Sequence, residues 1–242
     1  MRISAIIQTR TSSTRLPGKV LKELPENSGI TCLEHVIRRL KQCKKLDEII
    51  IATTTKKVDD IIIDVTKKEN IKYFRGSENN VLQRYYQAAI ENDVDIIVRV
   101  TSDCPCVEPK IVDRVIESHI KLRKTYIDFT ANNIIRTYPH GLDVEVFDFD
   151  ILERTYIEAK TDYDKEHVTP YIYNNPKKFR LNNITAPEEL LYPDLRITLD
   201  TEEDYKFLCM IFERLYPKNK YFNARDIVNL LGGEKWNIKE FM

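Results

Sequence analysis

Glycine and cysteine are scarce in this sequence. The 242 residues include six glycines, at positions 18, 29, 76, 141, 232 and 233, and no two of them form a Gly-x-Gly pair. This excludes the glycine-rich fingerprint of dinucleotide-binding folds. The five cysteines are an odd number without a framework spacing, and Cys104-x-Cys106 has no second Cys or His pair to complete a zinc site. We therefore expect reduced cysteines and no zinc site.

An excess of one charge and long hydrophobic runs are also lacking. The 38 basic and 38 acidic side chains give a formal net charge of zero, whereas general binders of nucleic acids or membrane surfaces carry a large basic field. No apolar run approaches the roughly 18 residues that cross a bilayer. The N-terminal residues MRISAIIQTR lead straight into a strand rather than a secretory leader. The sequence predicts a soluble, cytoplasmic protein without nucleic-acid or membrane partners.

The chain does contain a regular alternation of two kinds of segment. Short runs rich in Ile and Val predict strands, and their nearly continuous apolar character is typical of parallel strands covered on both faces. We expect strands at Ile3–Thr9, Glu48–Thr53, Ile71–Phe74, Asp95–Val100, Val144–Phe147, Phe179–Ile184 and Leu195–Leu199. Amphipathic segments predict a helix beginning at Thr31 and helices at Val58–Lys68, Asn80–Glu91, Pro109–Leu122, Asp148–Ala159 and Glu202–Leu215.

This order of segments predicts an α/β fold. Strands that alternate with helices form a doubly wound sheet, here mixed but mainly parallel. The length suits a single domain over residues 1–242. The less regular stretch around residues 125–190 predicts a small inserted lobe, which we expect to serve acceptor binding or dimerisation.

The segment after the first strand is strongly basic. The first 22 residues contain five basic side chains and no carboxylate, although the chain as a whole is neutral. Arg10, Arg15 and Lys19 follow the carboxyl end of a strand, where open α/β sheets bind ligands. Their charges suit a triphosphate better than a single phosphate, although a solvated basic turn explains the loop equally well when it is taken alone. A Walker A loop is excluded, because Gly18-Lys19 is followed by Val20.

Two aspartates follow predicted strands. Asp103 comes after Asp95–Val100, and Asp200 comes directly after Leu195–Leu199. Carboxylates at strand ends can meet across a sheet, and one or two of them together with phosphate oxygens suit Mg²⁺. Each has a structural alternative, since Asp200 can cap the following helix and Asp103 can start a turn before Pro105. Considered together with the basic loop, the pair favours a Mg²⁺ site.

Seven short motifs run in order through roughly residues 1–210. They are Ser13–Lys19, Phe74–Glu78, Arg84–Tyr86, Thr101–Pro105, Gly141–Phe147, Glu166–Tyr171 and Leu199–Thr201. The series resembles the sugar-acid cytidylyltransferases, which include the 3-deoxy-manno-octulosonate and acylneuraminate enzymes. It is most similar to the branch named for spore coat polysaccharide biosynthesis protein F. Such a series is far more specific than any one motif.

The resemblance implies a nucleotide-diphospho-sugar transferase-like fold, CTP and Mg²⁺ as ligands, and often a homodimer. It implies transfer of CMP from CTP to a sugar acid or related sugar, with release of pyrophosphate, for surface polysaccharide or glycoconjugate biosynthesis. The implied catalytic residues are Arg15, Lys19, Asp103 and Asp200, of which the two aspartates are metal ligands. The implied nucleotide-binding residues are Gln8, Arg10, Ser13, Arg15, Lys19, Arg75 and Ser77.

The acceptor is less well defined by these motifs. Ser12, Ser102 and Glu202 replace a Gly, a Gly and a Pro that are common in this branch, and the family's sugar-binding residues do not align clearly. A sugar acid carries a carboxylate and hydroxyls, so cations and hydrogen-bonding side chains in 125–190 are candidates. We expect acceptor contacts from Arg136, Asp143, Glu145 and His167. A structural hydrogen bond for His167 and a turn at Asp143 explain these two residues at least equally well.

Three other activities stay open. One is nucleotidyl transfer to a phosphorylated sugar or polyol. Another is a nucleotide-sugar-dependent glycosyltransferase that uses Asp148 and Asp150, a pair that suits a helix cap better. A third is a non-catalytic nucleotide-binding subunit. Trp236, the single tryptophan, suits either packing on the domain or a subunit interface.

Overall fold

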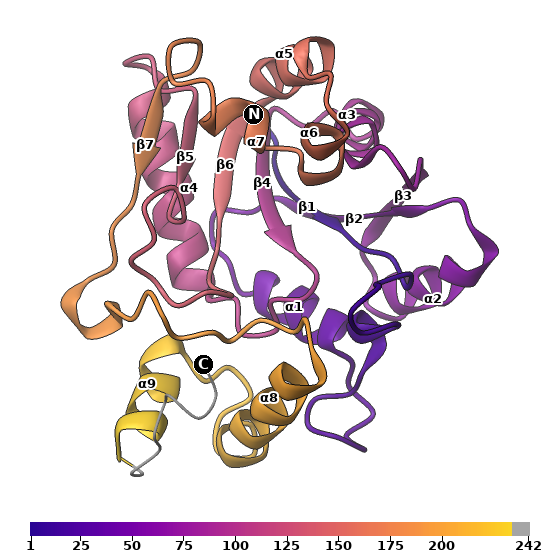
Figure 1. The fold of residues 1–242 in the computed structure, drawn as a ribbon, viewed down its shortest axis with the longest axis vertical. Helices are drawn as coiled ribbons and strands as arrows, with labels where there is room; N and C mark the ends of the chain where they lie inside the picture. The colour runs from indigo at the N-terminus through magenta and orange to yellow at the C-terminus, as the bar shows by residue number, and fades with distance from the viewer. Residues whose placement is uncertain (234–242) are drawn as a thin grey trace.

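The strands join into one sheet (Figure 1). The computed structural model describes residues 1–233, so Trp236 lies outside the described residues. The parallel half of the sheet contains β1 (Ile3–Gln8), β2 (Glu48–Thr54), β3 (Lys72–Gly76) and β4 (Ile96–Thr101). The other strands are β5 (Phe129–Ala131), β6 (Glu145–Asp148) and β7 (Leu181–Asn183).

The strand order is β3-β2-β1-β4-β6-β5-β7. β6 is antiparallel to both of its neighbours, β4 and β5, whereas β7 lies parallel to β5 at the edge. The prediction of an α/β fold with a doubly wound, mixed and mainly parallel sheet is confirmed. Because β2 and β3 lie on one side of β1 and the later strands lie beyond β4, the order reverses between β1 and β4.

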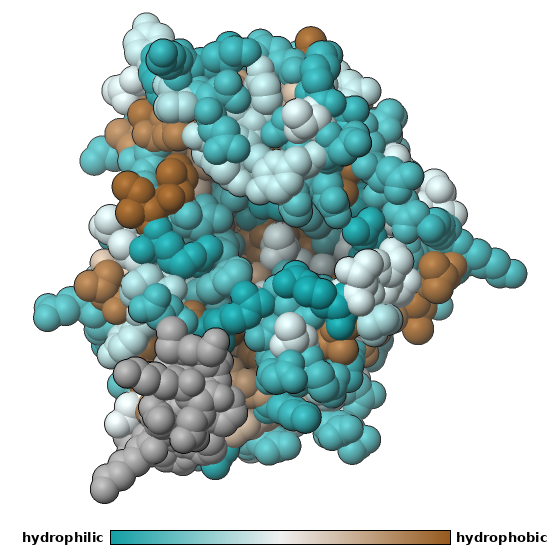
Figure 2. All heavy atoms as spheres, viewed as in Figure 1, coloured by the Kyte–Doolittle hydropathy of each residue, from teal (hydrophilic) through white to brown (hydrophobic). Residues whose placement is uncertain are grey.

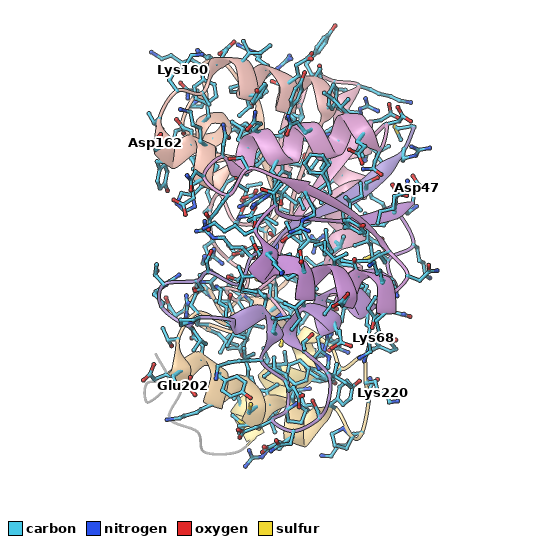
Figure 3. All side chains as sticks on the ribbon, turned by 90° about the vertical axis from the view of Figure 1, so that its right-hand side faces the viewer. Asp47, Lys68, Lys160, Asp162, Glu202 and Lys220 are labelled. Atoms are coloured by element: carbon cyan, nitrogen blue, oxygen red, sulfur yellow. The ribbon has the colours of Figure 1, made fainter. Side chains whose placement is uncertain are left out.

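Helices cover both faces of the sheet (Figures 1 and 3). One face packs against α1 (Cys32–Leu40), α2 (Asp60–Lys68), α4 (Pro109–Arg123), α8 (Glu202–Leu215) and α9 (Ala224–Gly233). The other face carries α3 (Val81–Glu91), α5 (Phe149–Glu158), α6 (Asp162–His167) and α7 (Pro170–Tyr173). Short 3₁₀ turns are η1 (Lys19–Leu21), η2 (Lys57–Asp59) and η3 (Glu188–Leu190). Within residues 1–233, none of the helices combines the length and the apolar character that a bilayer crossing requires.

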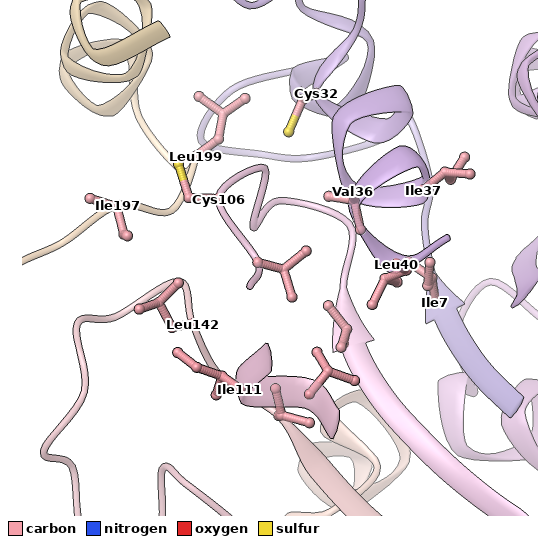
Figure 4. Close-up of a cluster of buried hydrophobic side chains, with 14 of the residues drawn as sticks. Ile7, Cys32, Val36, Ile37, Leu40, Cys106, Ile111, Leu142, Ile197 and Leu199 are labelled. Atoms are coloured by element: carbon pink, nitrogen blue, oxygen red, sulfur yellow. The ribbon is translucent and has the colours of Figure 1, made fainter. Parts of the chain in front are cut away.

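The central strands supply side chains to two separate hydrophobic clusters. Ile7 of β1 lies in the cluster under α1, close to Leu40, whereas Ile6 belongs to the cluster under α3 (Figure 4 shows the first). Because side chains alternate between the faces of a strand, a strand covered on both faces must be apolar throughout. This explains the continuous apolar runs. Cys32 and Cys106 are fully buried free thiols in the first cluster, where they pack as small hydrophobic side chains.

Most predicted boundaries agree with the structure within one or two residues. α1 begins with a capping box, in which Thr31 Oγ1 accepts a hydrogen bond from Glu34 N (3.2 Å) and Glu34 Oε2 accepts one from Thr31 N (2.7 Å). Asn80 caps α3 and Thr201 caps α8, so each of these helices starts at a polar side chain that satisfies a free backbone N–H. The elements that the sequence did not predict are β5, α6, α7 and α9.

The predicted strand at Leu195–Leu199 is wrong. This stretch forms one isolated bridge, to His140, and its other backbone hydrogen bonds go to loops. For example, Leu199 N donates to Asp103 O (2.8 Å). Alternate residues of the stretch are buried in the core, which gives it the apolar pattern of a strand without a neighbouring strand. The stretch still carries Asp200 to the carboxyl end of β4.

Residues 125–190, which we predicted to form an inserted lobe, supply β5, β6 and β7 to the main sheet and α5, α6 and α7 to one face. Asp148, the predicted helix cap, occupies the N-cap position of α5 but makes no capping hydrogen bond. Its Oδ1 instead lies 2.9 Å from Arg123 Nη2. Asp148 pairs in register with Ile96 at the start of β4, so it lies at the edge of the sheet opposite the carboxyl ends of the parallel strands.

His35 is buried in the contact between α1 and α8. Its Nε2 lies 2.6 Å from Leu24 O, and its ring centroid lies 4.5 Å from that of Phe212 and 5.1 Å from that of Tyr216. Burial lowers the pKa of His35 from 6.5 to about 4, although the hydrogen bond to Leu24 opposes this shift. The folded protein therefore holds a neutral imidazole at this position at neutral pH.

The neutral His35 predicts a loss of stability on acidification. Between pH 6.5 and about 4 the unfolded chain binds a proton at His35 that the folded chain excludes, so the free energy of unfolding falls as the pH falls. At about 1.4 kcal/mol per pKa unit, this group contributes a loss of about 3 kcal/mol. Urea unfolding at several pH values measures the slope. His35→Gln keeps an N–H donor without titrating here and should flatten the slope, and equal slopes in the two proteins would contradict the assignment.

Candidate active site

A polar cleft of about 410 Å³ lies at the carboxyl ends of β1 and β4, where the strand order reverses. Open α/β sheets bind ligands at such a point. Figure 2 shows the hollow near the middle of the face, bordered mainly by hydrophilic residues. Ten of the thirteen predicted site residues line this cleft, namely Gln8, Arg10, Ser13, Arg15, Lys19, Asp103, Asp143, Glu145, His167 and Asp200.

Lys19 joins the two predicted aspartates. Its Nζ lies 2.5 Å from Asp103 Oδ2 and 2.7 Å from Asp200 Oδ1. Arg15 Nη2 also contacts Asp200 Oδ1 (2.9 Å), and Arg196 Nη2 contacts Asp200 Oδ2 (2.5 Å). The structure therefore brings the basic loop and both carboxylates to one point, although they lie far apart in the sequence.

These contacts shift the ionisation of both partners. Burial alone would raise the pKa of Asp200, but hydrogen bonds and charge from Lys19 and Arg196 outweigh it, and the pKa falls below the usual 3.8. Burial likewise disfavours the charged form of Lys19, yet Asp103 and Asp200 together raise its pKa above 10.5. Lys19 and Asp200 are therefore both charged at neutral pH, and each stabilises the charge of the other.

A buried aspartate holds the basic loop in shape. Asp59, which is 1% exposed, accepts hydrogen bonds through Oδ1 from Thr11 N (2.8 Å) and Thr11 Oγ1 (2.7 Å), and through Oδ2 from Thr54 Oγ1. Gly18 N donates to Thr11 O (2.9 Å) from a residue with φ of +69°, a conformation that glycine adopts without steric cost. The loop thus closes just before Lys19. We did not predict a role for Asp59 from the sequence, because its position at the start of a helix is the only local signal that it carries.

A buried ion pair lies deeper in the cleft. Arg99 Nη1 contacts Glu145 Oε2 (2.8 Å), and Thr169 Oγ1 (2.9 Å) and Asn133 Nδ2 (3.1 Å) donate to the same carboxylate. Burial disfavours the charge on Arg99, but the charge of Glu145 and its hydrogen bond raise the pKa of Arg99 overall. Arg99 was not predicted, although one arginine within the apolar run of β4 signals a buried pair.

The predicted acceptor residues connect to this region through a second network. Arg136 donates two hydrogen bonds to Asp143 (2.8 and 3.0 Å), and His140 Nε2 lies 3.7 Å from the same carboxylate. Arg196 Nη1 lies 3.1 Å from His140 Nδ1, which links the network to Asp200. Burial lowers the pKa of His140 in spite of Asp143. Arg136 itself is not among the residues that line the cleft.

Helix α6 reaches the basic loop from the opposite side of the cleft. Arg10 Nη2 lies 3.2 Å from Glu166 Oε1, and both side chains are partly exposed. His167, the next residue, also lines the cleft, and its ring centroid lies 4.5 Å from that of Tyr163. The pair therefore connects a predicted phosphate contact to the segment that carries a predicted acceptor contact.

Two predicted nucleotide contacts lie outside the cleft lining. Arg75 donates to Thr54 O (2.8 Å) and Lys56 O (2.8 Å), and its Nη1 lies 2.7 Å from Asp60 Oδ1. Ser77 Oγ accepts a hydrogen bond from Asn80 N (3.1 Å) ahead of α3. In the described structure both residues therefore support the turns around β3.

The cleft offers two converging carboxylates rather than a larger ligand cluster. Among residues 1–233, no group of three or more His, Cys, Asp or Glu side chains is arranged to hold a metal ion. Hard cations such as Mg²⁺ are commonly held by one or two carboxylates together with phosphate oxygens and water. The arrangement therefore suits chemistry in which a phosphate-bearing substrate completes a cation site.

Known proteins resemble this chain over most of its length. The spore coat polysaccharide biosynthesis protein SpsF of Bacillus subtilis is 36% identical over 228 residues, which cover 93% of this chain and 92% of that protein. An uncharacterized protein of Methanocaldococcus jannaschii is 44% identical over 207 residues, or 85% and 81% of the two chains. A 3-deoxy-manno-octulosonate cytidylyltransferase of Geobacter metallireducens is 29% identical over 154 residues, or 56% of each chain.

Solved structures and a family model agree with these relatives. A cytidylyltransferase from Leptospira borgpetersenii superposes with a TM-score of 0.89 at 33% identity and covers 96% of this chain and 94% of its own. A CMP:2-keto-3-deoxy-manno-octonic acid synthetase complexed with CTP shares the fold, with a TM-score of 0.65 at 12% identity over 88% of this chain and 99% of its own. The cytidylyltransferase family model matches residues 4–230. The chain therefore belongs to the cytidylyltransferase family and is a CTP-dependent nucleotidyltransferase, as the sequence predicts.

Proposed function

We propose that this enzyme transfers CMP from CTP to a hydroxyl group of a sugar acid or related sugar, with Mg²⁺ and with release of pyrophosphate. The observation that carries the proposal is the convergence of Asp103 and Asp200 on Lys19 at the end of the basic loop. The names of its relatives suggest a role in surface polysaccharide or glycoconjugate biosynthesis. We further propose that it acts as a cytoplasmic homodimer, and that residues 125–190 of its single domain provide the acceptor side.

The two aspartates fit a bound Mg²⁺. Their oxygens lie 2.5 and 2.7 Å from one cation, the Nζ of Lys19, so both carboxylates already point at a position that holds positive charge. Asp103 and Asp200 would hold the metal, and phosphate oxygens and water would complete its shell. When bound, Mg²⁺ would supply positive charge beside the α-phosphate, which reduces the repulsion that an incoming hydroxyl oxygen meets.

The chain's own residues would act mainly by position and charge. The acceptor hydroxyl loses its proton to solvent and its oxygen forms a bond to the α-phosphorus, while the bond from this phosphorus to the bridging oxygen breaks and pyrophosphate leaves with the electron pair. Arg10, Arg15 and Lys19 would stabilise the charge that grows on the leaving phosphates. The Arg15 side chain is 65% exposed and would exchange Asp200 for a triphosphate.

The acceptor would lie beside the buried Arg99–Glu145 pair and the Asp143 network. Glu145, Asp143 and His167 line the cleft and would bind sugar hydroxyls. Arg136 would position Asp143 through its two hydrogen bonds rather than contact the acceptor. The pair Asp148 and Asp150 offers little support for a glycosyltransferase, because Asp148 lies at the opposite edge of the sheet beside Arg123.

The direct test measures pyrophosphate release from CTP and Mg²⁺ with a panel of 2-keto sugar acids. Release with at least one of them supports the proposal. Release only with phosphorylated sugars or polyols would redirect it to a sugar-phosphate nucleotidyltransferase. CTP binding without turnover on either panel would contradict catalysis and favour a nucleotide-binding subunit.

Asp103→Asn should lower kcat by a factor of about 10²–10³ or more, because a neutral amide neither binds a hard cation well nor pairs with Lys19. Pyrophosphate release measures the rate, and circular dichroism checks the fold. Asp64→Asn on the exposed side of α2 is the matched control and should keep full activity. Full activity in Asp103→Asn would remove Asp103 from the mechanism.

Lys19→Met should have two opposite effects. It should lower kcat/KM for CTP at least tenfold, because the ammonium that stabilises the leaving phosphates is lost. A tenfold decrease corresponds to about 1.4 kcal/mol of transition-state stabilisation. It should also strengthen Mn²⁺ binding to the nucleotide-free protein, because the ammonium that occupies both carboxylates is gone. Electron paramagnetic resonance of Mn²⁺ measures the second effect. Unchanged CTP use together with unchanged Mn²⁺ affinity would contradict the assignment.

A further inference from the structure

The two aspartates of the cleft share one pattern of contacts. Asp103 Oδ2 and Asp200 Oδ1 both lie against Lys19 Nζ, at 2.5 and 2.7 Å. The second oxygen of each carboxylate accepts a hydrogen bond from a different neighbour. Thr101 Oγ1 donates to Asp103 Oδ1 (2.6 Å), and Arg196 Nη2 donates to Asp200 Oδ2 (2.5 Å). Each aspartate therefore offers one oxygen to the position of the ammonium and has the other oxygen engaged.

Arg196 is held at all three nitrogens of its guanidinium. Besides the contact of Nη2 with Asp200, Nε donates to Asp204 Oδ1 (3.0 Å) and Nη1 lies 3.1 Å from His140 Nδ1. Because an arginine side chain has only donors, His140 accepts here through Nδ1. Asp204 Oδ2 also accepts a hydrogen bond from Asp200 N (2.8 Å). The Asp200 carboxylate therefore cannot rotate without breaking contacts of both its side chain and its partners.

Thr101 is equally well fixed. It is the last residue of β4 and pairs in register with Gln8 of β1, so its backbone belongs to the centre of the sheet. Its hydroxyl also lies 3.2 Å from Cys104 Sγ. Both contacts are satisfied at once when the thiol donates to the hydroxyl oxygen and the hydroxyl donates to Asp103. The sheet thus holds one oxygen of Asp103 as Arg196 holds one oxygen of Asp200.

Carboxylates that offer one oxygen each suit some hard cations better than others. Mg²⁺ requires an octahedral shell, keeps several waters and is held by one or two carboxylates together with phosphate oxygens. Ca²⁺ takes about six to eight oxygens and often binds both oxygens of a carboxylate. An aspartate with one engaged oxygen costs Mg²⁺ nothing, whereas it withholds from Ca²⁺ the ligands that complete its larger shell.

We propose that Thr101 and Arg196 are positioning residues that restrict Asp103 and Asp200 to one-oxygen contacts and so make the enzyme select Mg²⁺ over Ca²⁺. Each acts through the aspartate that it holds rather than by touching the metal. Loss of either contact frees a carboxylate oxygen, and this oxygen then becomes available to the larger ion. The inference rests on the proposed use of the two aspartates as metal ligands.

The test measures the ratio of the dissociation constants for Ca²⁺ and Mn²⁺. Mn²⁺ takes octahedral oxygen sites as Mg²⁺ does and is visible by electron paramagnetic resonance. All proteins carry Lys19→Met, which removes the ammonium between the carboxylates, and Mn²⁺ is titrated without nucleotide, with Ca²⁺ as the competitor. Adding Thr101→Val or Arg196→Met should lower the ratio at least about tenfold through tighter Ca²⁺ binding, an effect common for groups that orient a metal ligand. A change in charge alone would alter both constants by the same factor.

Two controls separate the contact from the fold. Thr101→Ser keeps the hydroxyl and should keep the ratio. Arg123→Met matches Arg196→Met, because the Arg123 side chain is 32% exposed against 31% for Arg196 and pairs with Asp148 away from the cleft. An unchanged ratio in both Thr101→Val and Arg196→Met would overturn the inference alone. If the protein with Lys19→Met binds no Mn²⁺, the metal site of the proposed function is wrong as well.

Discussion

The contact of one ammonium with two carboxylates organises the cleft. Lys19 comes from the loop after β1, Asp103 from the end of β4, and Asp200 from the extended stretch before α8. β1 and β4 are paired as far as Gln8 and Thr101, and beyond these strand ends the charge cluster joins the side chains of the three segments. Because Lys19 and Asp200 are largely buried, their attraction is screened less than that of a surface pair.

The backbone around the cluster shows how that arrangement is kept. Leu199 N and Thr198 Oγ1 both donate to Asp103 O, which fixes the stretch before Asp200 against the turn after β4. On the other side, Asp59 ties Thr11 to α2 and so anchors the loop that presents Lys19. The functional side chains thus stand on segments that are held at several points, which is what preorganised electrostatic stabilisation requires.

The sequence predicts those features of the fold and the site that depend on residues close together in the chain, and it misses those that depend on tertiary contacts. The capping box at Thr31 and the apolar runs of β1 and β4 are local patterns, so those elements were predicted closely. The stretch Leu195–Leu199 has the same local pattern but pairs with loops, which only the tertiary structure decides. The basic loop and both aspartates were found because they follow apolar runs at the sheet's carboxyl edge. Asp59 was missed, because its contacts with Thr11 join residues 48 positions apart in the sequence.

The contact between Arg10 and Glu166 couples two halves of the cleft. A phosphate bound at Arg10, as in the proposed function, would meet the Glu166 carboxylate at the same guanidinium, so repulsion between the two anions would link filling of the phosphate end to the hold on α6. Linkage then runs in both directions: a molecule that draws Glu166 away makes the arginine more available, and an anion on the arginine loosens the hold on α6. Under the proposed use of the cleft, this one exposed ion pair would link occupation of the phosphate end to the position of α6.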